Sequence, residues 1–462
     1  MRNFLKRLSL VLIALVSALG LTACGKDEGP AVTEDGAAIL KVAFAECGYG
    51  REFLLQWEKA YNEAYPNEKI KLDPDGDAQM TQNIINRIDT GKNLPDIVMV
   101  LSTNWQLWAA KGKILEIDDV YEADAGLGDG TKMKDFIDPN ISEFGLVNGH
   151  YYAVPWSVGT TGFVYNKGMF EEWGWEVPET VEELVTLCEK IKSDTGGTIA
   201  PFAWSTAVAE YWSFVTLNWW AQYEGAEKFK EFWKFETPDV YKQEGRLKAL
   251  QTFERLVCGK DASGNPTGEA INSITNAKFM ESQLDFVQGR AAMIPNGVWL
   301  ENEMRNNLPA GFQMAMMPTP AIEGAKRDAD GNLIDVNVNS SGDFILIPRG
   351  AKNPDAAKKF LAFINSKQGC EIFTRYTGAI RPFQYEPSKV EGLTPFAKDA
   401  ATQWENAINL YQTSTSEKHF RNSVGLWPFY GSPYSRMVQD GDSAEEVHKA
   451  ICDYVSQYWN TF

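Results

Sequence analysis

The sequence predicts an α/β protein built on open, mostly parallel sheets. Short apolar runs typical of buried strands alternate with amphipathic helical patterns, and this alternation continues to the end of the chain. The chain has 462 residues, enough for two or three domains. We therefore expect more than one α/β region and ample material for a cleft.

The first segment is predicted to be an export signal. Arg2, Lys6 and Arg7 precede an apolar run from Leu8 to Leu21, which is too short for a membrane span. The sequence Leu21-Thr22-Ala23-Cys24 resembles the bacterial lipobox, so Cys24 is the expected lipid-bearing first residue; an ordinary signal peptide cleaved near Ala23 is the alternative. We expect a signal peptide over 1–23 and a flexible polar tether over 24–38.

Three strands and two helices are expected next. The runs "ILKVAFA" (39–45), "KIKLD" (69–73) and "PDIVMVL" (95–101) read as strands. Apolar residues recur at helical spacing over 53–64 and 80–88 between them. This β-α-β-α-β order indicates a parallel sheet with right-handed crossovers.

In such a sheet, ligands bind beyond the carboxyl ends of the strands. The segments at those ends are 46–50, 74–79 and 102–105. Their candidate ligand-binding residues are Glu46, Tyr49, Asp77, Ser102, Asn104 and Trp105. Since loops are polar in any case, ordinary surface polarity is the competing interpretation for them.

A second α/β region follows residues 151–167. A capping box at Thr180 and Glu183 predicts a helix, Asn353-Pro354 opens another, and Ser443 with Glu446 predicts the last one. We find neither an internal repeat nor a low-complexity tract beyond residue 38.

Composition limits the chemistry. Without Arg2, Lys6 and Arg7 the chain carries 41 basic and 62 acidic residues, a net charge of −21, which argues against nucleic-acid binding. Five cysteines remain after Cys24, with no C-x-x-C pair, so whether any disulfide forms stays open. They are Cys47, Cys188, Cys258, Cys370 and Cys452.

No catalytic or metal motif is recognised. The three histidines, His150, His419 and His448, suggest neither a triad nor a metal cluster. The acidic loops 73–77 and 328–332 do not fit an EF-hand, and the second is better explained as a hairpin turn. We expect no cofactor, no metal and no enzymatic activity, although carboxylate pairs of the kind used by glycosidases depend on spatial separations that the sequence does not give.

Aromatic residues are the most informative signal. Many lie in turn-rich stretches, where packing in a core is less natural: Trp105, Trp156, Trp204, Trp299, Trp427 and Tyr434. Aromatic faces suit the C–H faces of sugar rings, while amides, carboxylates and arginines bind hydroxyls. Structural packing is the competing interpretation for each.

Four motifs in order resemble the extracellular solute-binding proteins of bacterial ABC importers, the carbohydrate-binding family that includes maltose-binding protein. These are "TGKNLPDIVMV" (90–100), "GHYYAVPWSVGTTGFVYNKGMFEEWGWEVPETVEEL" (149–184), "FVQGRAAMIPNGVW" (286–299) and "IPRGAKNPDAAKKFLAFINS" (347–366). The resemblance implies two α/β lobes joined by chain crossings, with the ligand held between them.

The resemblance also implies boundaries and site residues. Crossings are expected near Ser157–Thr161, Met317–Pro320 and Pro348–Asn353, giving one lobe from 39–157 and 320–350 and another from 158–319 and 351–462. Trp299 matches the family's stacking tryptophan, Asn296 shares its loop, and Tyr434 and Trp427 correspond to its late aromatic residue. The sequence lacks the family's Asp-Arg pair near Asn104 and has Gly159 at a glutamate position, so specificity is assigned to other groups, including Glu46, Asp77, Asp343 and Arg381.

The function implied is that of a monomeric, lipid-anchored receptor. It would bind a mono- or oligosaccharide and deliver it to ABC permease subunits from the outer face of the cytoplasmic membrane, or from a periplasm. The alternatives are the same fold binding a peptide, a polyamine or an anion, a sensor, and a secreted glycosidase. The sequence identifies neither the solute nor the permease.

Overall fold

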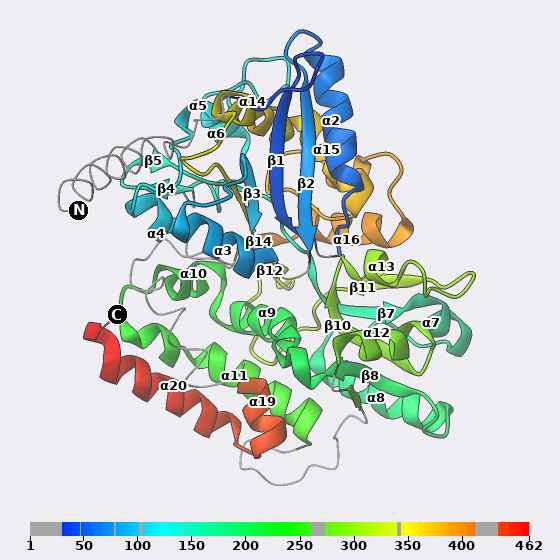
Figure 1. Cartoon of the computed structure of the whole chain (residues 1–462). Coiled ribbons are helices and arrows are strands. Elements are labelled where there is room, and N and C mark those ends of the chain that lie inside the picture. Colours follow the sequence, from blue (N-terminus) through cyan, green and yellow to red (C-terminus); the bar gives the residue numbers. More distant parts are fainter. Residues whose placement is uncertain are drawn as a thin grey trace, which may run out of the picture.

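Two five-stranded sheets, each flanked by helices, form the two lobes of the protein (Figure 1). The computed structural model describes residues 30–46, 48–77, 80–100, 105–143, 145–259, 273–276, 278–339, 343–411 and 433–461. We call the elements around the first sheet the first lobe and those around the second sheet the second lobe.

The first sheet has the strand order β2-β1-β3-β13-β6. Its strands are β1 (Ala38–Ala45), β2 (Ile70–Asp77), β3 (Ile97–Val100), β6 (Val154–Pro155) and β13 (Phe344–Leu346). The β1, β2 and β3 strands pair in parallel, whereas β13 is antiparallel to both its neighbours. The predicted β-α-β-α-β start is thus confirmed.

Helices cover this sheet and extend its core. They are α2 (Glu52–Ala64), α3 (Met80–Thr90), α4 (Trp105–Ala110), α5 (Asp118–Tyr121), α6 (Met133–Phe136), α14 (Pro354–Ile364) and α15 (Lys367–Thr377), with the hairpin β4 (Leu146–Val147) and β5 (His150–Tyr151). The α2 helix joins α15 through the buried indole of Trp57, whose Nε1 donates to Gly369 O at 2.9 Å. Apolar residues at helical spacing explain both helices, since they face one shared core.

The second sheet has the order β11-β7-β10-β8-β9. Its strands are β7 (Thr161–Asn166), β8 (Ala200–Ser205), β9 (Ser273–Asn276), β10 (Ala291–Gly297) and β11 (Met314–Met317). Only β7 runs against its neighbours, because it pairs antiparallel with both β10 and β11. A separate parallel pair consists of β12 (Val336–Asn339) and β14 (Ile408–Tyr411).

The second lobe is rich in helices, and its last helix lies at the chain terminus (red in Figure 1). The helices are α7 (Lys167–Trp173), α8 (Val181–Asp194), α9 (Ser213–Glu224), α10 (Ala226–Lys234), α11 (Glu244–Phe253), α12 (Phe279–Val287), α13 (Leu300–Met304), α16 (Pro395–Asn406), α19 (Pro433–Ser435) and α20 (Ala444–Tyr458). The predicted capping box at Ser443 and Glu446 is complete, and Thr180 accepts from Glu183 N at the start of α8.

Only one of the three expected crossings is where the sequence placed it. The chain leaves the first sheet after β6 and enters the second at β7, so residues 156–160 form the first crossing. The second was expected at Met317–Pro320, but Pro320 O accepts from Trp219 Nε1 at 3.0 Å and stays in the second lobe. The chain crosses instead between β12 and β13.

The third crossing was expected at Pro348–Asn353, which is also wrong. Pro348 forms a bridge with Ile114, and Asn353 N donates to Asp96 Oδ1 at 2.8 Å, so this segment remains in the first lobe. The chain crosses after α15, between Phe383, which bridges to Ile137, and α16, which lies along β11.

These contacts change the predicted lobe boundaries. Residues 320–339 belong to the second lobe, and α14 and α15, which were assigned there, pack on the first. The physical reason is side-chain burial: Phe360 and Phe373 contact Trp57 of α2.

The predicted tether is shorter than expected. Val32 bridges to Ala38, and Asn353 Nδ2 donates to Ala31 O at 3.0 Å. Residues 31–38 are therefore bound to the first lobe, and Cys24 lies outside the described residues.

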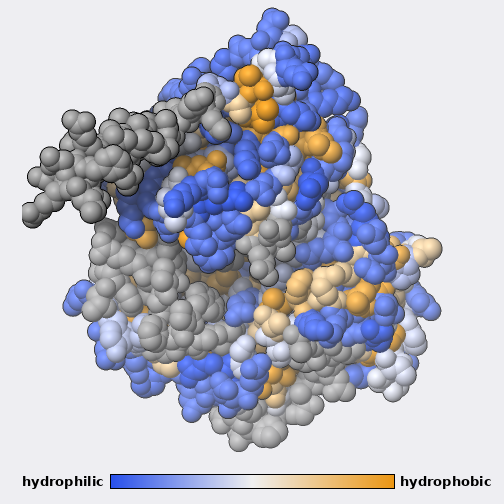
Figure 2. Space-filling model, in the orientation of Figure 1, coloured by the Kyte–Doolittle hydropathy of each residue, from blue (hydrophilic) through white to orange (hydrophobic). Residues whose placement is uncertain are grey.

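The visible face of the molecule is largely hydrophilic, with hydrophobic side chains in small patches (Figure 2). Large apolar side chains that remain exposed include Trp173, Phe279 and Met280. Within the described part of the chain, no helix has the length and apolar character needed to cross a membrane.

Candidate functional site

The two lobes come close together at Gly48 and Trp299. Gly48 lies in the loop between β1 and α2, and Trp299 precedes α13. A Cβ atom on Gly48 would lie 2.6 Å from the Cβ of Trp299, closer than real Cβ contacts come. The predicted stacking tryptophan is therefore at the junction of the lobes.

Other aromatic rings surround Trp299 in the second lobe. Tyr211 and Phe214 meet it edge-on, with ring centroids 6.1 Å and 5.7 Å away. Its indole lies over Gly297, where an added Cβ would come within 2.3 Å of the ring. Sequence reasoning did not select Tyr211 or Phe214, although both follow the carboxyl end of β8, the kind of position it searched in the first lobe.

Trp204 and Asn296 support this aromatic group from within. Both border a small hollow that Tyr211 also lines, and Asn296 is 1% exposed, its Oδ1 accepting from Gly297 N at 2.8 Å. Trp204 meets Trp212 edge-on and is 3% exposed. Asn296 thus bonds within the loop of Trp299, and both side chains are almost fully buried.

A cavity of about 640 Å³ lies between the lobes beside Gly48. Its wall includes the predicted residues Glu46 and Tyr49. The other lining residues are Ala45, Gly48, Gly50, Arg51, Glu52, Arg375 and Tyr376 of the first lobe and Phe279, Asn302, Glu303 and Arg305 of the second. Three carboxylates and three guanidinium groups thus face one space.

The charged groups of this cavity are bonded to neighbours. Arg51 Nε donates to Glu46 Oε1 at 3.0 Å, and Arg375 Nε donates to Glu391 O at 2.9 Å. Glu303 Oε2 accepts from Gln283 Nε2 at 2.7 Å, and burial raises the pKa of Glu303. Arg305 donates to Asn302 Oδ1. Because the carboxylates and guanidinium groups are equal in number and bonded to neighbours, they do not form the basic pocket that an anion needs.

Tyr49 connects this cavity to the first crossing. Its hydroxyl lies 3.4 Å from Ser157 Oγ, which also bonds Asp343 Oδ2 at 3.0 Å. Burial raises the pKa of Asp343 to about 7, and the hydrogen bond from Ser157 opposes that shift. Tyr49 and Asp343, far apart in sequence, thus share one partner at the hinge.

The predicted ligand role of Arg381 is wrong. Its side chain is fully buried, with NH1 donating to Ile364 O and NH2 to Pro155 O, both at 3.0 Å, and NH2 also to Asn365 Oδ1. Burial lowers its pKa. The guanidinium group therefore joins α14 to β6 and is not available to bind a ligand.

Three predicted aromatic residues are also core residues. Trp156 is fully buried against Tyr49, and Trp105 is fully buried against Phe344. Tyr434 bonds Thr216 Oγ1 at 2.5 Å and meets Phe253 edge-on, and burial raises its pKa to about 12. Packing in the core, and not contact with a ligand, therefore determines where these three rings lie.

The remaining predictions stay untested. Asp77 is the last residue of β2 and pairs with Ala45, the residue before Glu46. Its side chain is not among the described parts of the structure. Ser102, Asn104 and Trp427 lie outside the described residues.

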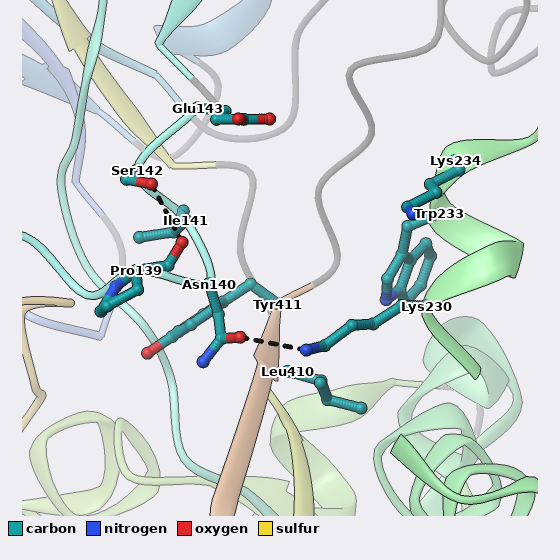
Figure 3. Close-up of a pocket in the computed structure, with 10 residues that line it drawn as sticks. All are labelled: Pro139, Asn140, Ile141, Ser142, Glu143, Lys230, Trp233, Lys234, Leu410 and Tyr411. Carbon is teal, nitrogen blue, oxygen red and sulfur yellow. Dashed lines mark hydrogen bonds between the residues drawn. The ribbon is translucent and has the colours of Figure 1, made fainter. Parts of the chain in front are cut away.

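A second interlobe cavity, of about 280 Å³, was not foreseen (Figure 3). Residues 139–143 of the first lobe face Lys230, Trp233 and Lys234 of α10 across it, and Lys230 Nζ donates to Asn140 Oδ1 at 3.2 Å. Tyr411 OH donates to Asp138 Oδ2 at 2.5 Å. Residues from such distant segments meet only through the lobe arrangement, so the sequence offered no local signal for them.

Comparisons with known proteins agree with this architecture. The multiple sugar-binding protein of Streptococcus mutans is 23% identical over 459 residues, covering 95% of this chain and 99% of its own. The diacetylchitobiose binding protein NgcE of Streptomyces coelicolor is 22% identical over 377 residues, covering 80% and 74%.

Solved structures share the fold. UgpB from Mycobacterium tuberculosis, solved in complex with glycerophosphocholine, matches with a TM-score of 0.67 at 16% identity, covering 92% of this chain and 99% of its own. The family model for bacterial extracellular solute-binding proteins matches residues 30–369. This chain therefore belongs to the family of bacterial extracellular solute-binding proteins.

Proposed function

We propose that this protein is the receptor of an ABC importer and captures a sugar or oligosaccharide between its two lobes. The observation that carries the proposal is Trp299, which lies at the lobe junction against Gly48. An indole there meets the apolar face of a sugar ring, and the polar groups of Tyr49 and Glu46 in the adjoining wall bond its hydroxyls.

Charge balance supports an uncharged ligand. The wall beside Gly48 carries Glu46, Glu52 and Glu303 together with Arg51, Arg305 and Arg375. A dedicated anion or polyamine site would show an excess of one sign. Two relatives are named for sugar binding, which agrees with this choice of ligand class.

Binding is coupled to closure of the lobes. A ligand that contacts both lobes stabilises the closed arrangement because its affinity for the closed state is higher. The receptor is acylated at Cys24, held at the outer face of the cytoplasmic membrane or in a periplasm, acts as a monomer, and delivers its sugar to the permease without chemical change.

Replacement of Trp299 tests the proposal. A thermal-shift screen with sugars, peptides, polyamines and phosphodiesters identifies the ligand class first, since a bound ligand raises the melting temperature. With the best sugar, Trp299→Ala should weaken binding by about 2 kcal/mol or more in calorimetry, the range of an interface hot spot.

Trp173→Ala is the matched control, because Trp173 is exposed and stacks only on Trp175 among its described ring contacts. Equal affinity of Trp299→Ala and wild type would remove Trp299 from the site. Stabilisation by a peptide or a polyamine alone would contradict the sugar assignment, and release of reducing sugar from a bound oligosaccharide would contradict the receptor role.

A further inference from the structure

We propose that Glu116, Asp118 and His150 form a surface binding site for a first-row divalent metal ion of the Zn²⁺ type. Each offers one ligand atom, and these atoms lie within 4.8 Å of one another. Among the described residues, this is the group of three His, Cys, Asp or Glu side chains with such spacing. It lies in the first lobe and lines neither of the interlobe cavities.

The backbone holds the two contributing segments together. Ile117 N donates to Tyr151 O at 2.8 Å, and Tyr151 N donates to Asp118 Oδ1 at 2.7 Å. The start of α5 is thereby fixed beside β5. Ligands that are far apart in sequence are thus already close before any ion binds.

The carboxylates are oriented by groups that are not ligands. Tyr152 OH donates to Glu116 Oε1 at 3.1 Å, and Tyr151 N occupies Asp118 Oδ1. Glu116 Oε2 and Asp118 Oδ2 are the oxygens that remain for a metal, and the second of them also contacts His150 Nδ1. Partners of this kind fix ligand orientation in known metal sites.

His150 faces Asp118 across the cluster, with Nδ1 2.7 Å from Asp118 Oδ2. A bound metal ion would take the neutral imidazole and the two carboxylates as ligands in place of this hydrogen bond. Lys358 on α14 bonds the carboxylate of the neighbouring Asp119, at 3.0 Å and 3.1 Å.

The donor set selects the metal class. One imidazole and two carboxylates suit Zn²⁺ and its first-row neighbours, whereas Ca²⁺ and Mg²⁺ prefer oxygen ligands throughout. The side chains of His150 and Asp118 are 54% and 46% exposed, so an ion reaches them directly and water completes its coordination.

Zn²⁺ titration of the metal-free protein by calorimetry tests the proposal. We expect one Zn²⁺ per chain, with affinity lowered by about tenfold or more in both His150→Gln and Glu116→Gln. His448→Gln is the matched control: His448 contacts Arg246 in the second lobe, and its loss should leave the affinity unchanged.

Nuclear magnetic resonance of the histidines distinguishes direct Zn²⁺ binding at His150 from an indirect effect of the substitutions on the structure. The chain has three histidines, so three imidazole resonances are expected from selectively labelled protein, and His150→Gln assigns one of them. Zn²⁺ should shift that resonance at stoichiometric concentration. Equal Zn²⁺ binding by wild type and His150→Gln, wild-type affinity in Glu116→Gln, or an unmoved His150 resonance would each overturn the site.

Discussion

Asp343 is the residue whose chemistry depends most on its place in the fold. It follows the second crossing and accepts from Ser157 in the first, so one carboxyl group ties the two crossings together. Trp156 N also donates to Asp343 O at 2.8 Å. Burial raises the pKa of Asp343 to about 7.

The raised pKa predicts a stability change with pH. Between the ordinary carboxyl value of 3.8 and about 7, the folded protein keeps a proton that the unfolded chain has lost, so stability falls as pH rises through this window. Asp343→Asn keeps an acceptor for Ser157 and removes the titration. Urea unfolding at pH 5 and pH 8 should show the variant gaining stability relative to wild type at the higher pH; a constant difference would contradict the prediction.

Trp299 and Arg381 show what the sequence can and cannot predict about single residues. Trp299 was selected because it matches the stacking tryptophan of a recognisable family motif; it lies at the lobe junction, and its contact with a ligand stays a prediction. Arg381 was chosen for its chemistry alone, but three carbonyl-type acceptors use its donors in the core. Residue type suggests what a group is able to bind, whereas burial decides whether it is free to do so.

At the scale of elements, the loop between β1 and α2 packs closely against α13 and the residue before it, Trp299. Gly48 gives this loop its close approach, because any side chain there meets Trp299 and Glu303 of the second lobe. The loop also carries Glu46, Tyr49 and Arg51 into the interlobe cavity. One loop therefore both lines the candidate site and sets how near the lobes come.

Gly48→Ala should disfavour the close approach of the two lobes found in this structure. The added Cβ overlaps Trp299, and overpacking of this kind costs about 1–3 kcal/mol in this arrangement. Ligand affinity should fall by about 1 kcal/mol or more, and the radius of gyration in X-ray scattering should increase. Gly168→Ala is the control, since its Cβ has no neighbour nearer than 3.7 Å; an identical affinity in Gly48→Ala would show that the loop simply moves aside.

Elements were predicted better than their arrangement. The strands at 39–45, 69–73 and 95–101 and the two helices between them are present because periodicity is a local property. Two crossings were misplaced, because whether 320–339 or 354–377 packs on one sheet or the other depends on long-range contacts such as Trp57 with Gly369. No spacing in the sequence encodes those contacts.

At the scale of the whole molecule, the proposed lipid anchor at Cys24 would place the first lobe at a limited distance from the membrane. Because residues 31–38 are bound to the first lobe, only residues 24–30 remain as the proposed leash. A chain of seven residues spans at most about 25 Å. The first lobe would thus stay near the lipid surface, and Ala31 and Asn353 would mark the side that faces it.

Cys24→Ser tests this anchoring. The wild-type protein should partition into the detergent phase and carry fatty acyl groups at Cys24, because acyl chains supply the membrane affinity. The serine variant should partition into the aqueous phase with unchanged ligand affinity. A wild-type protein that is water-soluble and begins at a residue other than an acylated Cys24 would contradict the anchor and favour ordinary signal cleavage.

The strand that completes the first sheet arrives late in synthesis. Val100 of β3 pairs with Phe344 of β13, so β3 keeps an open edge until more than half of the chain has followed it. Closing so long a loop is slow, and an unpaired strand edge invites aggregation. For the exported receptor that we propose, an N-terminal segment unable to complete its sheet would leave time for translocation before the first lobe folds.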